Sequence, residues 1–431
     1  MISYKSSSFS YQFRTTLAAA LIGGSWWCTV RSSGEGSGPS MGLIFGLYWL
    51  LLMMWILPEF RIPKKSTYIL LVFVIGFGLA GMQGYGQFNQ WMQGFFYFDR
   101  SANLYTPISP LYGVYHLFIC GLTWGGWPAL LLSWILLHRT SEKLWIQRII
   151  IAVAAYVLMQ WLISLFPHLF LPLYSRGYYQ DLAFCPDCQR TLNTAANTYG
   201  YLGMVLLLTL HSAWVERKSL YVILPIALGF ALSFSVGGLL HRVDVHVENP
   251  WWKMWEYTCG FGGGMALFST FWLLKKRGIL QNYIAKIPDS PPAWQLWLGF
   301  WIPLYFAIGE LSRDRLHQVA KVWNILYGFD ARDLFAMLAL FAVVIVWGLL
   351  CLHLIRFLRH REDVDILRFR HPFKIFLIVY NGFYALILLY WIRFPLSFEN
   401  NVISILTLLS MTGVNILLVR LNSVLADSNI T

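Results

Sequence analysis

A small set of polar and charged residues stands at the ends of long apolar stretches, where the side chains could bind a solute. The set consists of Arg31, Glu35, Gln83, Tyr85, Gln87, His241, Arg242, Lys253 and Glu256. Arginine and lysine bind anionic groups, glutamine and tyrosine donate hydrogen bonds, and glutamate and histidine exchange protons. Ionisable groups close to a bilayer are costly and often functional. We therefore predict that these residues form a substrate-binding site.

The segment from His241 to Glu256 is the richest in such residues. Lys253 and Glu256 are three residues apart, which places them on one face of a helix. A local ion pair is the simpler interpretation of this spacing, and an acid–base pair is the alternative. If the helix starts near residue 254, Glu256 falls in its first turn, where the helix dipole favours an anion.

Two cysteines, Cys185 and Cys188, lie close together in a predicted outer loop. The space outside an inner membrane is oxidising, so we expect a local disulfide between them. A redox motif would need a thioredoxin-like context, and a zinc site would need four suitably spaced ligands. Neither pattern is visible in the sequence. We predict a disulfide, no metal site and no cofactor.

Long apolar stretches must position all of these residues. The chain has 431 residues, of which 58% are apolar and 12% charged, and its mean hydropathy is +0.57. Soluble domains carry roughly 25% charged residues, which excludes a cytosolic enzyme, a secreted disulfide scaffold and a disordered regulator. We predict an all-α, polytopic transmembrane helical bundle of about twelve spans. The predicted spans are residues 14–30, 41–57, 67–87, 112–137, 149–170, 198–214, 221–240, 254–274, 295–311, 333–357, 373–391 and 400–420.

The distribution of basic residues predicts the orientation of these spans. With the N-terminus inside, about two thirds of the 32 Lys and Arg residues fall in cytoplasmic segments. Both termini are therefore expected in the cytoplasm of a bacterial cell, with the protein in the inner membrane. The net charge of +12 is then an orientation signal and not a sign of nucleic-acid binding. The predicted partners are the lipid bilayer and either a small polar solute or a lipid-linked substrate.

Glycine-rich helix ends recur along the chain, in residues 23–51, 76–136 and 229–274. All three stretches point the same way, which favours a parallel repeat of helix hairpins. The alternative is that glycines recur because they let membrane helices pack closely. Glycines become sparser after residue 280, so we predict an eight-span core in residues 1–280 and a four-span bundle in residues 281–431.

Several glycine- and tryptophan-rich segments carry a resemblance to a protein family. They are residues 23–26, 31–34, 81–87, 121–126 and 252–256. Together they resemble a family of bacterial polytopic membrane proteins rich in Gly and Trp, over roughly residues 1–275. That family has no established activity, so the resemblance implies a multi-pass membrane fold and no particular reaction.

These features favour a secondary transporter or permease for a small polar or anionic solute. In that function Arg31, Arg242 and Lys253 bind an anionic group, and Gln83 and Gln87 donate hydrogen bonds to the solute. Glu35 and Glu256 carry a coupling proton. The absence of an acidic residue in the middle of any predicted span weakens this hypothesis.

The alternative is a membrane-embedded transferase or hydrolase that acts on a lipid-linked substrate at the outer leaflet. His241 or Glu256 would be the general base, while Arg31 and Arg242 would clamp a phosphate. The sequence contains no recognisable nucleophile motif, which weakens this alternative in turn. A third hypothesis is a structural or assembly subunit.

Overall fold

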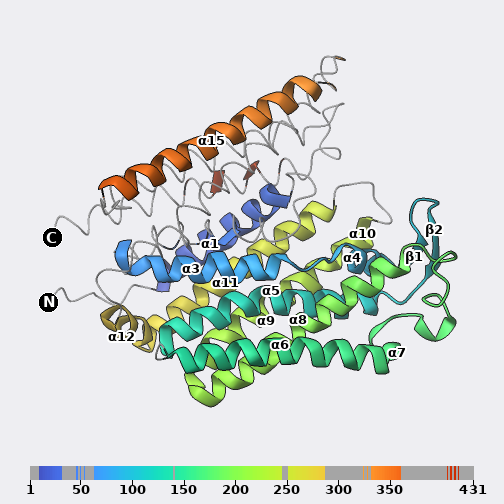
Figure 1. Cartoon of the computed structure of the whole chain (residues 1–431), viewed down its shortest axis with the longest axis horizontal. Helices are drawn as coiled ribbons and strands as arrows, with labels where there is room; N and C mark the ends of the chain where they lie inside the picture. The colour runs from blue at the N-terminus through green and yellow to red at the C-terminus, as the bar shows by residue number, and fades with distance from the viewer. Residues whose placement is uncertain are drawn as a thin grey trace. The chain divides into compact units, whose positions relative to one another are not determined.

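The computed structural model describes residues 9–31, 63–138, 141–244, 251–286 and 332–360, together with twelve single positions between and after these ranges. These parts are mostly helical (Figure 1). The chain divides into two compact units, which are described separately here. Residues 79–280 form the middle unit. Residues 1–78 and 281–431 form the terminal unit.

The terminal unit contains long helices and an aromatic core. Its elements are α1 (Phe9–Arg31), most of α3 (Pro63–Gly81), most of α12 (Ile279–Lys286) and α15 (Arg332–His360). Phe45 lies at the centre of the core, with its ring edge-to-face against Trp27, Trp49 and Phe77 at centroid distances of 4.7, 5.6 and 4.9 Å. The predicted spans 295–311 and 373–391 lie outside the described residues, as do most positions of 41–57 and 400–420.

The middle unit is a helical bundle with a small β-hairpin. Its longer helices are α5 (Leu111–Leu137), α6 (Glu142–Leu165), α8 (Cys188–Val215), α9 (Leu220–Gly238) and α11 (Trp251–Lys276). Its shorter elements are α4 (Gly86–Gln93), β1 (Phe95–Asp99), β2 (Leu104–Pro107), α7 (Pro167–Phe170), η2 (Tyr174–Arg176), η3 (Arg217–Ser219) and α10 (Leu240–Asp244). Helix α5 packs against α4, α8 and α9, while α9 also packs against α11 and α8 against α6. Helices α4 and α10 and the hairpin lie at the same end of this bundle (Figure 1).

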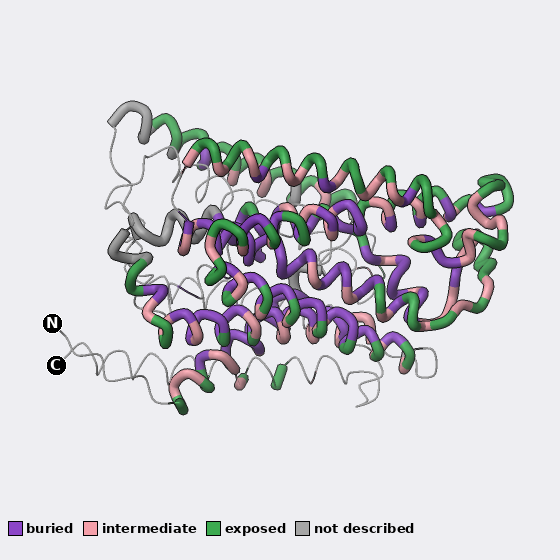
Figure 2. Tube along the Cα trace, turned by 90° about the horizontal axis from the view of Figure 1, so that it is seen from below, coloured by how far each residue is buried: buried purple, intermediate pink, exposed green. Residues whose placement is uncertain are grey.

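Among the described residues, four helical stretches are long and apolar enough to cross a membrane. They are Leu111–Leu137, Glu142–Leu165, Arg217–Val243 and Asp333–Leu352. The apolar part of α5 is 83% buried, whereas that of α6 is 17% buried and exposes residues such as Ile149, Val153 and Val157. Figure 2 shows how buried and exposed positions are distributed along the trace. An exposed apolar surface of this length suits contact with lipid. Twelve crossings and the orientation of the termini stay predictions.

Glycines bring the backbones of α5, α9 and α11 close together. A Cβ atom added at Gly121 of α5 would lie 2.5 Å from the carbonyl oxygen of Phe230 in α9, and one at Gly125 would lie 2.7 Å from that of Ile226. A Cβ atom at Gly263 of α11 would meet the ring of Phe230 from the other side. These glycines therefore serve close helix packing. A parallel repeat stays a prediction.

Several element boundaries differ from those predicted. The predicted span 67–87 is interrupted, because α3 ends at Gly81 and α4 begins at Gly86. Helix α6 ends at Leu165, directly before α7, whereas α8 begins at Cys188, well before residue 198. The polar first turns of α8 are stable as a helix because they pack on protein, so apolar content alone does not locate their start.

The β-hairpin is a feature that an all-α prediction does not include. Strand β1 pairs antiparallel with β2, and Gly94, with a φ of 96°, makes the turn that leads from α4 into β1. Glycine adopts this left-handed conformation without steric penalty. The signal in the sequence is the aromatic run 95–98, bounded by Gly94 and the turn residues 99–103.

A buried polar cluster joins α5, α6 and η3 at the end of the bundle away from the hairpin. The guanidinium of Arg148 donates to Nδ1 of His138 at 2.8 Å, so Nε2 of His138 carries the proton and donates to Oγ of Ser219, also at 2.8 Å. Arg148 also lies over the ring of Trp134, 4.2 Å from its centroid. Burial, followed by the nearby charge of Arg148, lowers the pKa of His138 to about 4.

Candidate functional site

The Trp255 cluster (Tyr85, Phe234, His241, Trp252 and Trp255) lies at the hairpin end of the middle unit. The indole N–H of Trp255 donates to the carbonyl oxygen of Phe234 at 2.9 Å, which fixes the orientation of the ring. Its ring lies 5.2 Å from that of Tyr85 and 5.1 Å from that of His241, centroid to centroid. The fold thus brings two predicted site residues from distant parts of the sequence to one aromatic side chain.

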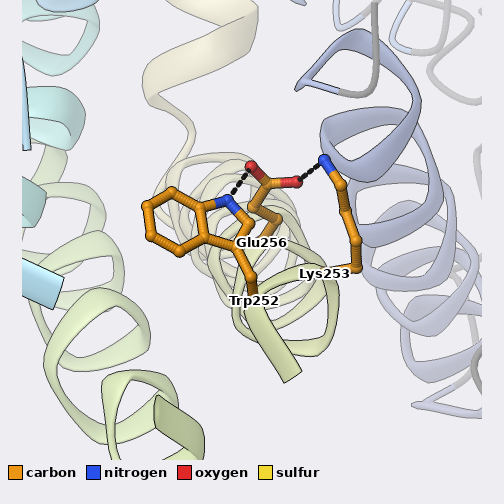
Figure 3. A network of polar contacts seen from close by, with 3 residues as sticks. All are labelled: Trp252, Lys253 and Glu256. Carbon is orange, nitrogen blue, oxygen red and sulfur yellow. Dashed lines mark hydrogen bonds and ion pairs between the residues drawn. The ribbon is translucent and has the colours of Figure 1, made fainter. Parts of the chain in front are cut away.

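Glu256 lies beside this cluster and is fully buried. One carboxylate oxygen, Oε1, accepts a hydrogen bond from the indole N–H of Trp252 at 2.7 Å (Figure 3). The other, Oε2, forms an ion pair with Nζ of Lys253 at 2.5 Å. The structure therefore contains the local ion pair that the three-residue spacing favours. Helix α11 begins at Trp251, so Glu256 lies beyond the first turn and its partners are side chains rather than the helix terminus.

Two polar side chains of this region are buried without a hydrogen-bond partner. His241 is 0% exposed and Asn89 of α4 is 1% exposed. Neither ring nitrogen of His241 and neither amide atom of Asn89 has a partner in the described part of the chain. Buried polar groups are normally hydrogen-bonded, so such groups mark positions that water or a ligand can fill.

Contacts on both sides hold α4 and α10 in place. The rings of Phe88 and Trp91 in α4 pack against His116 of α5, at centroid distances of 4.9 and 4.8 Å. Nη1 of Arg242 in α10 donates to the carbonyl oxygen of Gln93 at 2.7 Å, at the C-terminal end of α4. A cation at this end of a helix also interacts favourably with the helix dipole. These contacts keep α10, and with it His241, against α4.

The two predicted glutamines point toward other helices. The Oε1 atom of Gln83 accepts from the hydroxyl of Thr123 and from the thiol of Cys120, both in α5. The Nε2 atom of Gln87 donates to the carbonyl oxygen of Thr191 in α8 at 3.2 Å. These hydrogen bonds tie the chain between α3 and α4 to α5 and α8. The Nε2 atom of Gln83 is buried and has no partner among the described residues.

The remaining predicted residues are placed as follows. Arg31 is the last residue of α1, but its side chain lies outside the described set, and Glu35 lies outside the described residues altogether. Tyr85, His241, Arg242, Lys253 and Glu256 are gathered around α4, α10 and the start of α11.

Cys185 and Cys188 form a disulfide directly before α8. Asp187 lies between them and reaches the hairpin, because its Oδ2 atom accepts from the backbone N–H of Arg100 at 2.6 Å. Its own backbone N–H donates to the carbonyl oxygen of Phe98 at 3.2 Å. This turn therefore fastens the hairpin to the beginning of α8.

The buried Asn89 of this region was missed by the sequence analysis, as were Arg100 and Arg190, which line an open pocket on the surface of the middle unit. Asn89 falls four residues after Tyr85, and this helical spacing could have placed it on the same face of α4. Arg100 stands next to the turn of the hairpin and Arg190 stands next to the disulfide. The two arginines are far apart in the sequence, so no residue spacing links them. In the part of the chain that the structure describes, no group of His, Cys, Asp and Glu side chains could hold a metal ion.

Comparison of the chain with models of protein families, with curated proteins and with solved structures finds no match. The resemblance to Gly- and Trp-rich membrane proteins stays a prediction, and the function has to be argued from the site itself.

Proposed function

We propose that the protein is a secondary transporter for a small polar or anionic solute, which binds beside the Trp255 cluster. The observation that supports this function is that the polar atoms of two buried side chains, His241 and Asn89, have no hydrogen-bond partner among the described residues. Leaving a buried donor or acceptor unpaired costs about 1–3 kcal/mol, so the fold keeps these groups against a free-energy penalty. A solute that hydrogen-bonds to them would offset that penalty.

The surroundings of these groups indicate the chemistry of the solute. Asn89 offers two donors and an acceptor, and His241 offers one donor and one acceptor when neutral. The ring of Trp255 lies next to His241, and that of Tyr85 lies next to Trp255, so both supply apolar faces on this side of the site. Arg242 is exposed and lies next to His241 in α10, where its charge attracts an anionic group. This combination suits a small solute with hydrogen-bonding groups and a negative charge.

A break in the helices next to the site suits a transporter. The chain leaves α3 at Gly81 and resumes a helix at Gly86. Interrupted helices at a binding site expose backbone groups to the solute and can move relative to each other. Transfer of a coupling proton to Glu256 would require Lys253 to leave the ion pair, which links protonation to a movement of the start of α11.

Solute uptake into proteoliposomes tests the proposal. Labelled carboxylates, phosphate esters and zwitterions are screened by counterflow, and the transported solute is then measured with His241→Phe and Asn89→Leu. Each substitution replaces an unpaired polar group with an apolar one of similar shape, so the fold should be as stable as before or more stable. Uptake should require roughly tenfold more solute, which corresponds to about 1.4 kcal/mol of lost hydrogen bonding.

Ser133→Ala is the matched control for these variants. Ser133 is buried in α5 and its hydroxyl donates within the helix to the carbonyl oxygen of Leu130, so its loss should leave uptake unchanged. Wild-type uptake by both His241→Phe and Asn89→Leu, with unchanged solute affinity, would refute the proposed binding site.

One observation favours the alternative function of a transferase or hydrolase for lipid-linked substrates. The polar residues around the Trp255 cluster gather at one end of the middle unit, where α5, α8 and α11 begin and α9 ends. His241 would then act as the general base. Incubation with phospholipids and polyprenyl-diphosphate-linked sugars, followed by mass spectrometry, tests this function. A product that disappears in His241→Phe, without any solute flux in the wild type, favours the enzyme over the transporter.

A further inference from the structure

A second site lies on the surface of the middle unit, between α4, the hairpin and the beginning of α8. It is a small pocket that is open to solvent. We call it the arginine pocket. Its polar wall consists of Gln87, Gln90, Tyr97, Arg100, Asp187 and Arg190. No sequence motif marks this pocket, because its residues come from three separate segments of the chain.

The charges in the arginine pocket leave its cations available. Arg100 and Arg190 are exposed, and in the described residues neither guanidinium forms an ion pair or a hydrogen bond. Asp187 is the acidic residue of the wall, and its Oδ2 atom accepts from the backbone N–H of Arg100. The wall therefore combines two free guanidinium groups with one carboxylate and carries a net positive charge.

Other donors point to the same ligand chemistry. The amide of Gln90 and the hydroxyl of Tyr97 line the pocket and have no hydrogen-bond partner among the described residues. Arg190 lies in the first turn of α8, a helix of 28 residues, whose N-terminus contributes a partial positive charge. Guanidinium groups bind phosphate oxygens through pairs of parallel hydrogen bonds.

We propose that the arginine pocket binds a phosphate monoester group. A phosphate dianion matches two guanidinium charges better than a carboxylate does, and Tyr97, which also lines the pocket, can contact the ester group. The phosphate can belong to a soluble ester or to a lipid headgroup such as that of phosphatidic acid. The phosphate would bind to Arg100 and Arg190, which are not part of the Trp255 cluster.

The disulfide and Asp187 hold this pocket in shape. Arg100 lies at the end of β1, and Arg190 follows the Cys185–Cys188 turn by two residues. The two bonds between this turn and the hairpin bring the segments of both arginines to the same pocket. The backbone positions of both arginines are therefore set before a ligand binds, which favours affinity.

Binding to the purified full-length chain in phosphatidylcholine nanodiscs tests the proposal. Glycerol 3-phosphate and inorganic phosphate are titrated by calorimetry, and phosphatidic acid is added to the nanodiscs and followed by native mass spectrometry. Arg100→Gln and Arg190→Gln should each weaken binding roughly tenfold, and the double variant should abolish it. Arg176→Gln removes an exposed arginine outside the pocket and should leave binding unchanged.

The two arms identify the source of the phosphate. Saturable binding of glycerol 3-phosphate indicates a soluble ester, whereas retention of phosphatidic acid alone indicates a lipid. The proposal is overturned if glycerol 3-phosphate, inorganic phosphate and phosphatidic acid all fail to bind. It is also overturned if the double variant of Arg100 and Arg190 binds them as tightly as Arg176→Gln does. His241→Phe should bind phosphate like the wild type, so loss of transport in that variant and loss of phosphate binding in the arginine variants are separate results.

Discussion

Replacing Gly121 with alanine tests the close approach of α5 and α9, on which the middle unit depends. A Cβ atom at this position would lie 2.5 Å from the carbonyl oxygen of Phe230 and 2.8 Å from the Cα atom of Ala231. Both neighbours are backbone atoms of a helix, which cannot turn away as a flexible side chain could. The substitution must therefore move one helix relative to the other.

The distances give the size of the effect. Ordinary van der Waals contact begins at 3.4 Å, so the added atom is about 0.9 Å too close to Phe230. Overpacking of this kind costs about 1–3 kcal/mol, and contact with backbone on the other side places Gly121 at the upper end. The better helix propensity of alanine offsets about 1 kcal/mol. We expect a net loss of about 2 kcal/mol in the free energy of unfolding.

Equilibrium unfolding by sodium dodecyl sulfate in mixed micelles, followed by tryptophan fluorescence, measures this loss. The control is Gly348→Ala in α15, where no atom of the described residues lies within 4 Å of the added Cβ. The control should be neutral or stabilising by up to about 1 kcal/mol. If Gly121→Ala is as stable as Gly348→Ala, the helices are not as close as described and the packing argument is wrong.

Two further predictions concern charged and titratable groups. Glu256→Gln removes the carboxylate that pairs with the ammonium of Lys253 and should destabilise the protein, whereas Lys253→Met combined with Glu256→Gln should recover part of that loss. A double-mutant cycle measures this coupling, and a coupling energy near zero would contradict the ion pair. The stability of the protein should also fall as the pH drops from about 6.5 to about 4, because the pKa of His138 is lowered in the fold and the unfolded chain therefore binds the proton first. The group contributes at most about 1.4 kcal/mol per pH unit, and denaturation at a series of pH values should show a shallower decline for His138→Gln.

The local features of the fold and of the site could be predicted from the sequence. The apolar composition predicts long helices, and the described chain is mostly helical. The spacing of Lys253 and Glu256 places both side chains on one helix face, and that of Cys185 and Cys188 allows a disulfide within one turn. In each case the partners are three residues apart, so the local backbone brings them into contact.

The sequence predicted the extent of the elements less well. Hydropathy does not separate a helix that packs on lipid from one that packs on protein, and it missed the polar start of α8. The hairpin was missed because its aromatic residues also fit an apolar membrane segment. Only the pairing of Phe95 with Pro107 and of Phe96 with Thr106 shows that these residues form strands.

The sequence by itself determined the helical, apolar character of the protein and the pairs that lie within one turn. The tertiary structure alone decided that Tyr85 and His241 meet at Trp255, and that Arg100 and Arg190 line one pocket. The physical reason is that these contacts join segments far apart in the chain. Their formation depends on how α4, α10 and the hairpin pack on α5 and α8, and no residue spacing encodes that packing.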